Sequence, residues 1–178
     1  MSLSVIVITR NEEDMIGRCL ASVRWADEII VLDSGSTDRT VAICREAGAN
    51  VIVTDWPGFG PQKNRALEQA TGTWVLSLDA DEYLTEEAQA EIRAALASEP
   101  AVDAFRMPRL SSYCGRFMRH GDCCPDYVTR LFRRGCHVIW GRPRPEGSGA
   151  AEGGLGVGFQ GTGRPIVILG ARRLDPAS

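Results

Sequence analysis

Short apolar runs alternate with amphipathic segments along the first 110 residues of this chain. The apolar runs are rich in β-branched residues and predict buried strands at residues 3–9, 28–33, 51–54, 74–79 and 104–108. Between them, the spacing of apolar positions predicts helices that follow residues 11 and 37, and further helices at 62–70 and 85–97. Asn11 is predicted to cap the first of these helices. This alternation of strand and helix predicts an α/β fold, with a mostly parallel sheet and helices on both faces.

The pattern changes after residue 108. Residues 109–139 interleave arginines with aromatic residues, which suits a surface for nucleic acid or another anionic ligand, and also suits ordinary strands with exposed charge. Residues 140–178 are rich in glycine, proline and arginine, which is typical of poorly ordered chain, although a short apolar run at 165–169 could pair locally. We therefore expect a domain at residues 1–136 and a poorly ordered tail at residues 137–178.

Charge and hydropathy narrow the choice of partners and location. The 178 residues carry a net charge of −3, which argues against nucleic acid as a partner. No apolar run reaches the roughly 20 residues that cross a bilayer, and the run at 3–8 is too short for a signal peptide. We expect a cytoplasmic protein whose membrane contact would be peripheral, at the inner face of the membrane.

Three carboxylates follow one apolar run closely: Asp79, Asp81 and Glu82 come directly after residues 74–78. Acids crowded at the end of a strand repel one another unless a cation lies between them. Mg²⁺ commonly takes one or two carboxylates together with substrate phosphates. We therefore predict a metal and phosphate site, with Mg²⁺ or Mn²⁺ on Asp81. The alternative is a solvated acidic turn that also caps the next helix.

Polar residues follow the first two strands as well: Asn11 and Glu12 after the first, and Asp33 at the end of the second. The carboxyl ends of parallel strands meet at one edge of a sheet, so these side chains should converge with Asp79 and Asp81. The combination fits a nucleotide that carries a diphosphate. Asp33 would accept a hydrogen bond from its base or ribose.

Two basic residues open the helix predicted at 62–70. Lys63 and Arg65 could add positive charge beside the diphosphate, or could form a solvated helix face. No Gly-x-Gly-x-x-Gly follows the first strand, and the chain has neither a P-loop motif nor Gly-x-Ser-x-Gly. A dinucleotide-binding fold, a P-loop protein and a serine hydrolase are therefore not expected.

Four motifs in this order resemble those of family 2 glycosyltransferases, and in particular the lipopolysaccharide core-type glucosyltransferases. They are VITRNEE at 7–13, WADEIIVLDSGSTDRT at 25–40, GFGPQKN at 58–64 and SLDADE at 77–82. RHG at 119–121 and PDYVTRLFRRG at 125–135 also resemble that subgroup. Four motifs in the right order are far more specific than any one of them.

The resemblance implies a GT-A (Rossmann-like) fold and an inverting, metal-dependent transfer of a hexose. The donor would be a nucleotide sugar, expected to be UDP-linked, and the acceptor a glycolipid or polysaccharide of the cell envelope. Matching positions imply donor contacts at six residues: Thr9, Asn11, Glu12, Asp33, Lys63 and Asp79. The first three would lie beside the base, Asp33 beside base or ribose, and Asp79 beside the ribose, while Asp81 would hold the metal.

The resemblance ends after Gly135. The subgroup continues with strands and a Val-His-Glu element near the acceptor, whereas the residues here match what a shifted reading frame or a truncation would leave. Inverting transfer needs a general base for the acceptor hydroxyl, which is expected from that missing region, so the catalytic residue is unknown. Two alternatives stay open: a nucleotide-sugar-binding module with impaired catalysis, and a nucleotidyltransferase, which also uses carboxylates and metal on an α/β sheet.

Overall fold

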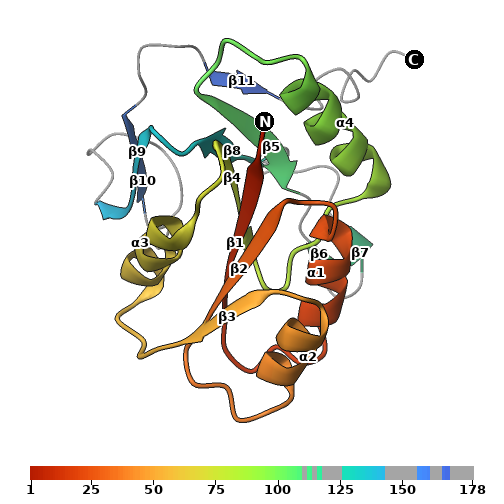
Figure 1. Ribbon diagram of the computed structural model, residues 1–178, viewed down its shortest axis with the longest axis vertical. Coiled ribbons are helices and arrows are strands. Elements are labelled where there is room, and N and C mark those ends of the chain that lie inside the picture. Colours follow the sequence, from red (N-terminus) through yellow and green to blue (C-terminus); the bar gives the residue numbers. More distant parts are fainter. Residues whose placement is uncertain (110–111, 114–115, 118–125, 143–155, 161–165, 169–178) are drawn as a thin grey trace.

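The computed structural model describes residues 1–109, 112–113, 116–117, 126–142, 156–160 and 166–168 (Figure 1). The strands are β1 (Leu3–Thr9), β2 (Glu28–Asp33), β3 (Asn50–Val53), β4 (Trp74–Asp79), β5 (Ala104–Arg109), β6 (Ser112–Tyr113), β7 (Arg116–Phe117), β8 (Asp126–Arg133), β9 (His137–Arg142), β10 (Gly156–Gln160) and β11 (Ile166–Ile168). The helices are α1 (Ile16–Val23), α2 (Thr40–Glu46), α3 (Phe59–Gln69) and α4 (Glu86–Ala97).

Seven strands of the described chain form one sheet, in the order β11-β5-β8-β4-β1-β2-β3. Strand β1 is parallel to β2 and β4, β2 is parallel to β3, and β11 is parallel to β5. Only β8 runs against its neighbours in this sheet, because it is antiparallel to both β4 and β5. The predicted α/β class with a mostly parallel sheet is therefore confirmed.

Helices cover both faces of the sheet, as the sequence predicts. Helices α1, α2 and α4 lie on one face and α3 on the other (Figure 1). Strand β1 is buried at all seven positions, and its side chains alternate between two cores. Val5 and Val7 pack into the core under α1, α2 and α4, whereas Ile6 and Ile8 pack into the core under α3. A strand buried on both faces explains why the sequence at 3–9 is almost continuously apolar.

Helix α3 starts three residues before the predicted boundary at residue 62. Gly60 and Pro61 look like turn residues in the sequence, but both lie in the first turn of this helix. Proline is tolerated there because the first amide groups of a helix have no intrahelical partner. Helix α4 agrees more closely with its prediction, since Thr85 caps it by accepting a hydrogen bond from the Ala88 amide at 3.2 Å.

Three strands lie within the segment that the sequence describes as a tail. Strands β9 and β10 form an antiparallel pair, and β9 lies beside α3 (Figure 1). The apolar run at 165–169 contains β11, which extends the main sheet by pairing with β5. The division into a domain and a tail at residue 136 stays a prediction. Among the described residues, no helix is both long enough and apolar enough to cross a bilayer.

Candidate functional site

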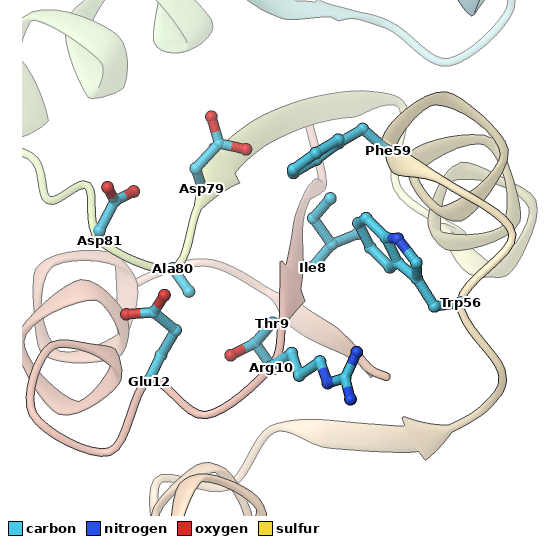
Figure 2. Close-up of a pocket in the computed structure, with 9 residues that line it drawn as sticks. All are labelled: Ile8, Thr9, Arg10, Glu12, Trp56, Phe59, Asp79, Ala80 and Asp81. Atoms are coloured by element: carbon cyan, nitrogen blue, oxygen red, sulfur yellow. The ribbon is translucent and has the colours of Figure 1, made fainter. Parts of the chain in front are cut away.

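A cavity of about 540 Å³ opens where the carboxyl ends of β1 and β4 meet. The two strands are parallel, and their register sets Ile8 beside Asp79. Figure 2 shows the residues that line the cavity: Ile8, Thr9, Arg10, Glu12, Trp56, Phe59, Asp79, Ala80 and Asp81. This is the sheet edge at which the sequence predicts a site, and four of the predicted residues lie in its lining.

The lining has two chemically different sides. Glu12, Asp79 and Asp81 form an acidic wall, and Trp56 and Phe59 form an aromatic wall on the other side of the cavity (Figure 2). The two rings meet edge to face with centroids 4.8 Å apart, yet Trp56 is 40% and Phe59 is 60% exposed. Large exposed aromatic residues in a concave site are characteristic of ligand binding, because they offer flat apolar area to a partner.

Asp79 lies in a network of four charged side chains. Its Oδ1 atom is 2.7 Å from Lys63 Nζ, and its Oδ2 atom is 3.1 Å from Arg130 Nη2. Arg130 also donates to Glu82 Oε1. Burial by itself would raise the pKa of Asp79, but Lys63 and then Arg130 outweigh burial and hold the pKa below its usual value. Asp79 is therefore a firmly ionised carboxylate with both oxygens in use.

Glu82 completes this network at the end of the same turn. Its Oε2 atom accepts a hydrogen bond from the Asp79 amide at 3.1 Å. Burial raises the pKa of Glu82; Arg130 opposes that change and the Asp79 carboxylate adds to it. The sequence marks Glu82 as acidic but does not indicate that it faces Arg130.

Asp81 and Glu12 are the other two carboxylates of the acidic wall. Asp81 is exposed and forms no hydrogen bond or ion pair with any residue that the structure describes. Burial raises the pKa of Glu12, and the Asp81 carboxylate raises it further. Two carboxylates that repel each other in one cavity are the environment that a divalent cation relieves.

The carboxylates of the cavity suit a cation that a ligand helps to bind. Within the described part of the chain, no three His, Cys, Asp or Glu side chains come together to hold a metal ion by themselves. Magnesium sites on enzymes that bind phosphates commonly use only one or two carboxylates, and substrate phosphates supply further ligands. Asp81, alone or with Glu12, is suited to that kind of site.

Thr9 supplies a polar atom with an unmet hydrogen bond. It ends β1 and lines the cavity, and its side chain is only 5% exposed. Its Oγ1 atom is buried and has no hydrogen-bond partner among the described residues. A buried hydroxyl without a partner costs free energy unless a ligand or water satisfies it. Thr9 thus lines the cavity and carries a buried hydroxyl that no described residue satisfies.

Asn11 holds two loops together and Asp33 closes the turn after β2, and both residues are absent from the lining of the cavity. The Asn11 side chain accepts from the Thr37 amide at 2.8 Å, and the Asn11 amide donates to Ser36 Oγ at 2.8 Å. Asp33 is fully buried, and its Oδ1 atom accepts from the amides of Gly35 and Ser36 at 3.0 and 2.8 Å. Both residues shape the loops that follow β1 and β2.

The prediction that Asn11 caps a helix is wrong, because α1 begins only at Ile16 and its N-cap residue is Met15. Asn11 instead has a φ of 53°. Asparagine tolerates this left-handed conformation better than most residues do. The chain turns there toward Ser36 and Thr37, so the asparagine serves the contact between loops and not the helix.

The two predicted basic residues separate in space. Lys63 reaches Asp79, and its side chain is 12% exposed. Arg65, on the same helix, points to the loop before α3, where it binds Asp55 Oδ1 at 2.6 Å and Thr54 Oγ1 at 3.1 Å. The structure therefore brings Lys63, but not Arg65, to the acidic wall.

Sequence reasoning missed Arg130, Trp56 and Phe59 as members of this site. Trp56 and Phe59 stand out in the sequence as aromatic residues in a loop rich in glycine and proline, which was the available signal. Arg130 belongs to the basic stretch at 109–139, and no local pattern distinguishes it from its neighbours. Four cysteines and two histidines between positions 114 and 137 make a zinc site conceivable from the sequence, but His120 and Cys123 of that cluster lie outside the described residues.

Comparisons with known proteins agree on one family. The family model described as "Glycosyl transferase family 2" matches residues 4–150. A TPR repeat-containing protein of Synechococcus elongatus is 42% identical over 146 residues, which are 81% of this chain and 34% of that protein. LpsC of Rhizobium meliloti, a lipopolysaccharide core biosynthesis glycosyltransferase, is 32% identical over 140 residues, which are 76% of this chain and 52% of LpsC.

The chain is shorter than these relatives. It spans 34% of the length of the Synechococcus protein, and also 34% of an uncharacterized glycosyltransferase of Rickettsia felis that is 46% identical over 97 residues.

Solved structures share the fold. S. aureus TarS 1–349 in complex with UDP-GlcNAc has a TM-score of 0.57 and 27% identity, covering 75% of this chain and 46% of TarS. The M. tuberculosis glucosyl-3-phosphoglycerate synthase has a TM-score of 0.51 and 26% identity, covering 60% of this chain and 44% of the synthase. The fold is thus that of GT-A proteins, as the sequence predicts.

Proposed function

This chain belongs to glycosyl transferase family 2, and from that premise we propose that it transfers a hexose from a UDP-sugar to a glycolipid or polysaccharide of the cell envelope. The observation that carries the proposal is the cavity with its acidic and aromatic walls. A UDP-sugar has two matching parts, a diphosphate that binds a divalent cation and rings that stack on aromatic side chains. The crystallised complex of TarS with UDP-GlcNAc supports the choice of donor, and the name of LpsC supports the choice of acceptor.

Asp81 would hold a Mg²⁺ or Mn²⁺ ion against the diphosphate, and Glu12 lines the same side of the cavity. When bound, such an ion offsets the negative charge that develops on the departing diphosphate. Asp79 has a different part in the proposal. Both of its oxygens are occupied by Lys63 and Arg130, so it orients these two cations beside the donor.

The remaining contacts of the donor would come from Thr9 and from the aromatic wall. Thr9 would lie beside the nucleotide part of the donor. The Trp56 ring would stack on a base or sugar ring, an interaction of about 1–3 kcal/mol per base. Asn11 and Asp33 would act through the loops that they shape, because their oxygens already accept hydrogen bonds there. Inversion would require a base that deprotonates the acceptor hydroxyl.

The test is ligand-dependent thermal stability. A ligand that binds only the folded state raises the melting temperature, by an amount that grows with its concentration relative to its Kd. We expect UDP and UDP-sugars to stabilise the protein more with Mn²⁺ than with EDTA, and CTP to have little effect. Asp81→Asn should remove the Mn²⁺-dependent part and leave the ligand-free melting temperature unchanged, because the side chain is exposed and unpaired within the described chain.

The control variant is Asp14→Asn, which removes an exposed carboxylate outside the lining of the cavity. It should keep the response to UDP and Mn²⁺. A protein that UDP does not stabilise under any condition would contradict the proposal. Stabilisation by CTP instead of UDP would favour a nucleotidyltransferase, and UDP binding without sugar transfer to a lipid-linked acceptor would favour a nucleotide-sugar-binding module.

A further inference from the structure

Arg130 approaches the acidic wall from β8, the antiparallel strand between β4 and β5. Its side chain is only 10% exposed, and it lies 51 positions after Asp79 in the chain. Its Nη2 atom donates to Asp79 Oδ2 at 3.1 Å and also to Glu82 Oε1. The two carboxylates that it bonds are three positions apart, at the first and last residues of the turn that ends β4.

This turn is closed by hydrogen bonds in both directions. The Glu82 amide donates to the Asp79 carbonyl at 3.0 Å, and the Asp79 amide donates to Glu82 Oε2 at 3.1 Å. Between the two ends, Ala80 is buried and Asp81 is exposed in the cavity. Holding both ends of a four-residue turn restrains the backbone of its third residue. By bonding both ends, Arg130 restrains the backbone that carries Asp81.

The charges around this turn also indicate that Asp81 is the carboxylate available to a cation. Lys63 and Arg130 occupy one oxygen each of Asp79, and Arg130 also pairs with Glu82, so two cations balance two carboxylates. A metal ion that approached Asp79 would meet the repulsion of the Lys63 ammonium and the Arg130 guanidinium group. Asp81 has no such competitor among the described residues, and it is therefore the carboxylate of this turn that stays open to a cation.

We propose that Arg130 is a positioning residue of the donor site: it holds Asp79 and Glu82 in place so that Asp81 faces the cavity and binds the cation. This inference rests on the proposed function, because it concerns the cation of the same cavity. It extends that function by giving β8 a part in metal-dependent donor binding.

Three variants test the role. Arg130→Met removes the guanidinium group but keeps an unbranched side chain, and Arg130→Lys restores one positive charge. Arg133→Met is the matched control on the same strand. Arg133 bonds the carbonyls of Pro100 and Val102 at 2.6 and 2.9 Å, lies over the Trp74 ring, and does not touch the turn.

Two measurements are made on each folded variant. Hydrogen exchange at the Glu82 amide reports whether the turn is closed, and titration calorimetry gives the affinity for UDP with Mn²⁺ and with EDTA. We expect Arg130→Met to speed the exchange and to lower the Mn²⁺-dependent affinity by about 10–100-fold, which is typical for residues that orient metal ligands. Arg130→Lys should recover part of this loss. Arg133→Met should keep both wild-type values.

Wild-type exchange and wild-type Mn²⁺ dependence in Arg130→Met would overturn the inference, and so would an equal loss in Arg133→Met. If the wild-type protein bound no UDP, the proposed function would fail, and the exchange at Glu82 would still decide whether Arg130 holds the turn. If Arg130→Met did not fold, Glu82→Gln would replace it, since it weakens one of the two bonds. Unchanged exchange and unchanged Mn²⁺ dependence in that variant would count against the role.

Discussion

Gly72 is the position at which one added methyl group should disturb this fold most directly. It precedes β4, is buried, and lies against the start of β1. A Cβ atom there would be 2.7 Å from Ser4 Oγ, 2.8 Å from the Ser4 amide nitrogen and 3.1 Å from the Leu3 carbonyl carbon. Ordinary contacts of this kind are 3.4–4 Å long. Gly72→Ala therefore forces backbone apart in the centre of the sheet.

The local contacts leave little room for relaxation. Ser4 Oγ donates a hydrogen bond to Glu28 Oε2 at 2.5 Å and accepts one from the Gly72 amide at 2.8 Å. It cannot rotate away from the added methyl group without losing both bonds. The Leu3 and Ser4 backbone belongs to β1, which is paired on both sides. Overpacking of this kind costs about 1–3 kcal/mol. Because Gly72 does not have a positive φ, alanine also restricts the unfolded chain and returns about 0.4–1 kcal/mol.

The midpoints of these two ranges leave a net loss of about 1.3 kcal/mol, which corresponds to a fall of about 3–5 °C in melting temperature for a chain of this size. Gly17→Ala is the matched control, measured by circular dichroism under the same conditions. Its Cβ would lie on α1 and meet only Ile43 Cγ2 at an ordinary 3.7 Å, and alanine is the better helix former by about 0.5–1 kcal/mol. A melting temperature of Gly72→Ala at or above that of the wild type would refute this reasoning.

Three further predictions concern the site and its pH dependence. Trp56→Ala should lower UDP affinity about 5–150-fold, as the loss of one stacking contact does, with little change in melting temperature; wild-type affinity would exclude stacking. Lys63→Ala should weaken UDP binding more than Arg65→Ala, because Lys63 reaches Asp79 whereas Arg65 binds outside the cavity; the reverse order would contradict this placement. Burial alone would raise the pKa of Glu28, but its hydrogen bonds outweigh burial and lower the pKa. The Glu28 carboxylate therefore stabilises the folded protein at pH values above its unfolded pKa, and this stabilisation is lost as the pH falls through its folded pKa. Glu28→Gln should thus be less stable than the wild type at pH 7, with a gap that closes in thermal melts below about pH 4; a constant gap would be inconsistent with the lowered pKa.

The parts of the fold that could be predicted depend on short-range patterns. The run at 3–9 predicts β1 because a strand buried on both faces must be apolar at nearly every position. Helix α4 was predictable because Thr85 is followed by helical spacing and by Glu86 and Glu87 in the first turn, which suit the positive end of the helix dipole. Both signals lie within a dozen residues of the elements that they specify.

Strand β8 is an element whose place in the sheet cannot be predicted from such short-range patterns. Its sequence, DYVTRLFR, places polar and apolar residues in pairs and does not indicate which strands it joins. The pairing with β4 and β5 depends on contacts between residues that are far apart in the chain, such as Leu76 with Leu131 and Phe105 with Leu131.

The same limit applies to the candidate site. Thr9, Glu12, Asp79 and Asp81 were predictable because parallel strands bring their carboxyl ends to one edge. The position of Arg130 follows from the strand order, which the local sequence does not contain. Asn11 and Asp33 lie at the expected strand ends, but their side chains turn toward backbone amides of the next loop. The spacing of residues in the sequence does not indicate which way these two side chains point.

Strand β8 also matters while the chain is being synthesised, because it leaves the ribosome after the two strands that it joins. Residues 1–109 emerge first, and until residue 133 follows them, β4 at Trp74–Leu76 and β5 have no strand between them. Open apolar strand edges are templates for aggregation. A nascent chain that stalls before residue 126 would therefore expose these edges and would also lack Arg130. Closing the sheet and bringing Arg130 to the acidic wall both depend on β8, so a chain that ends before this strand has neither.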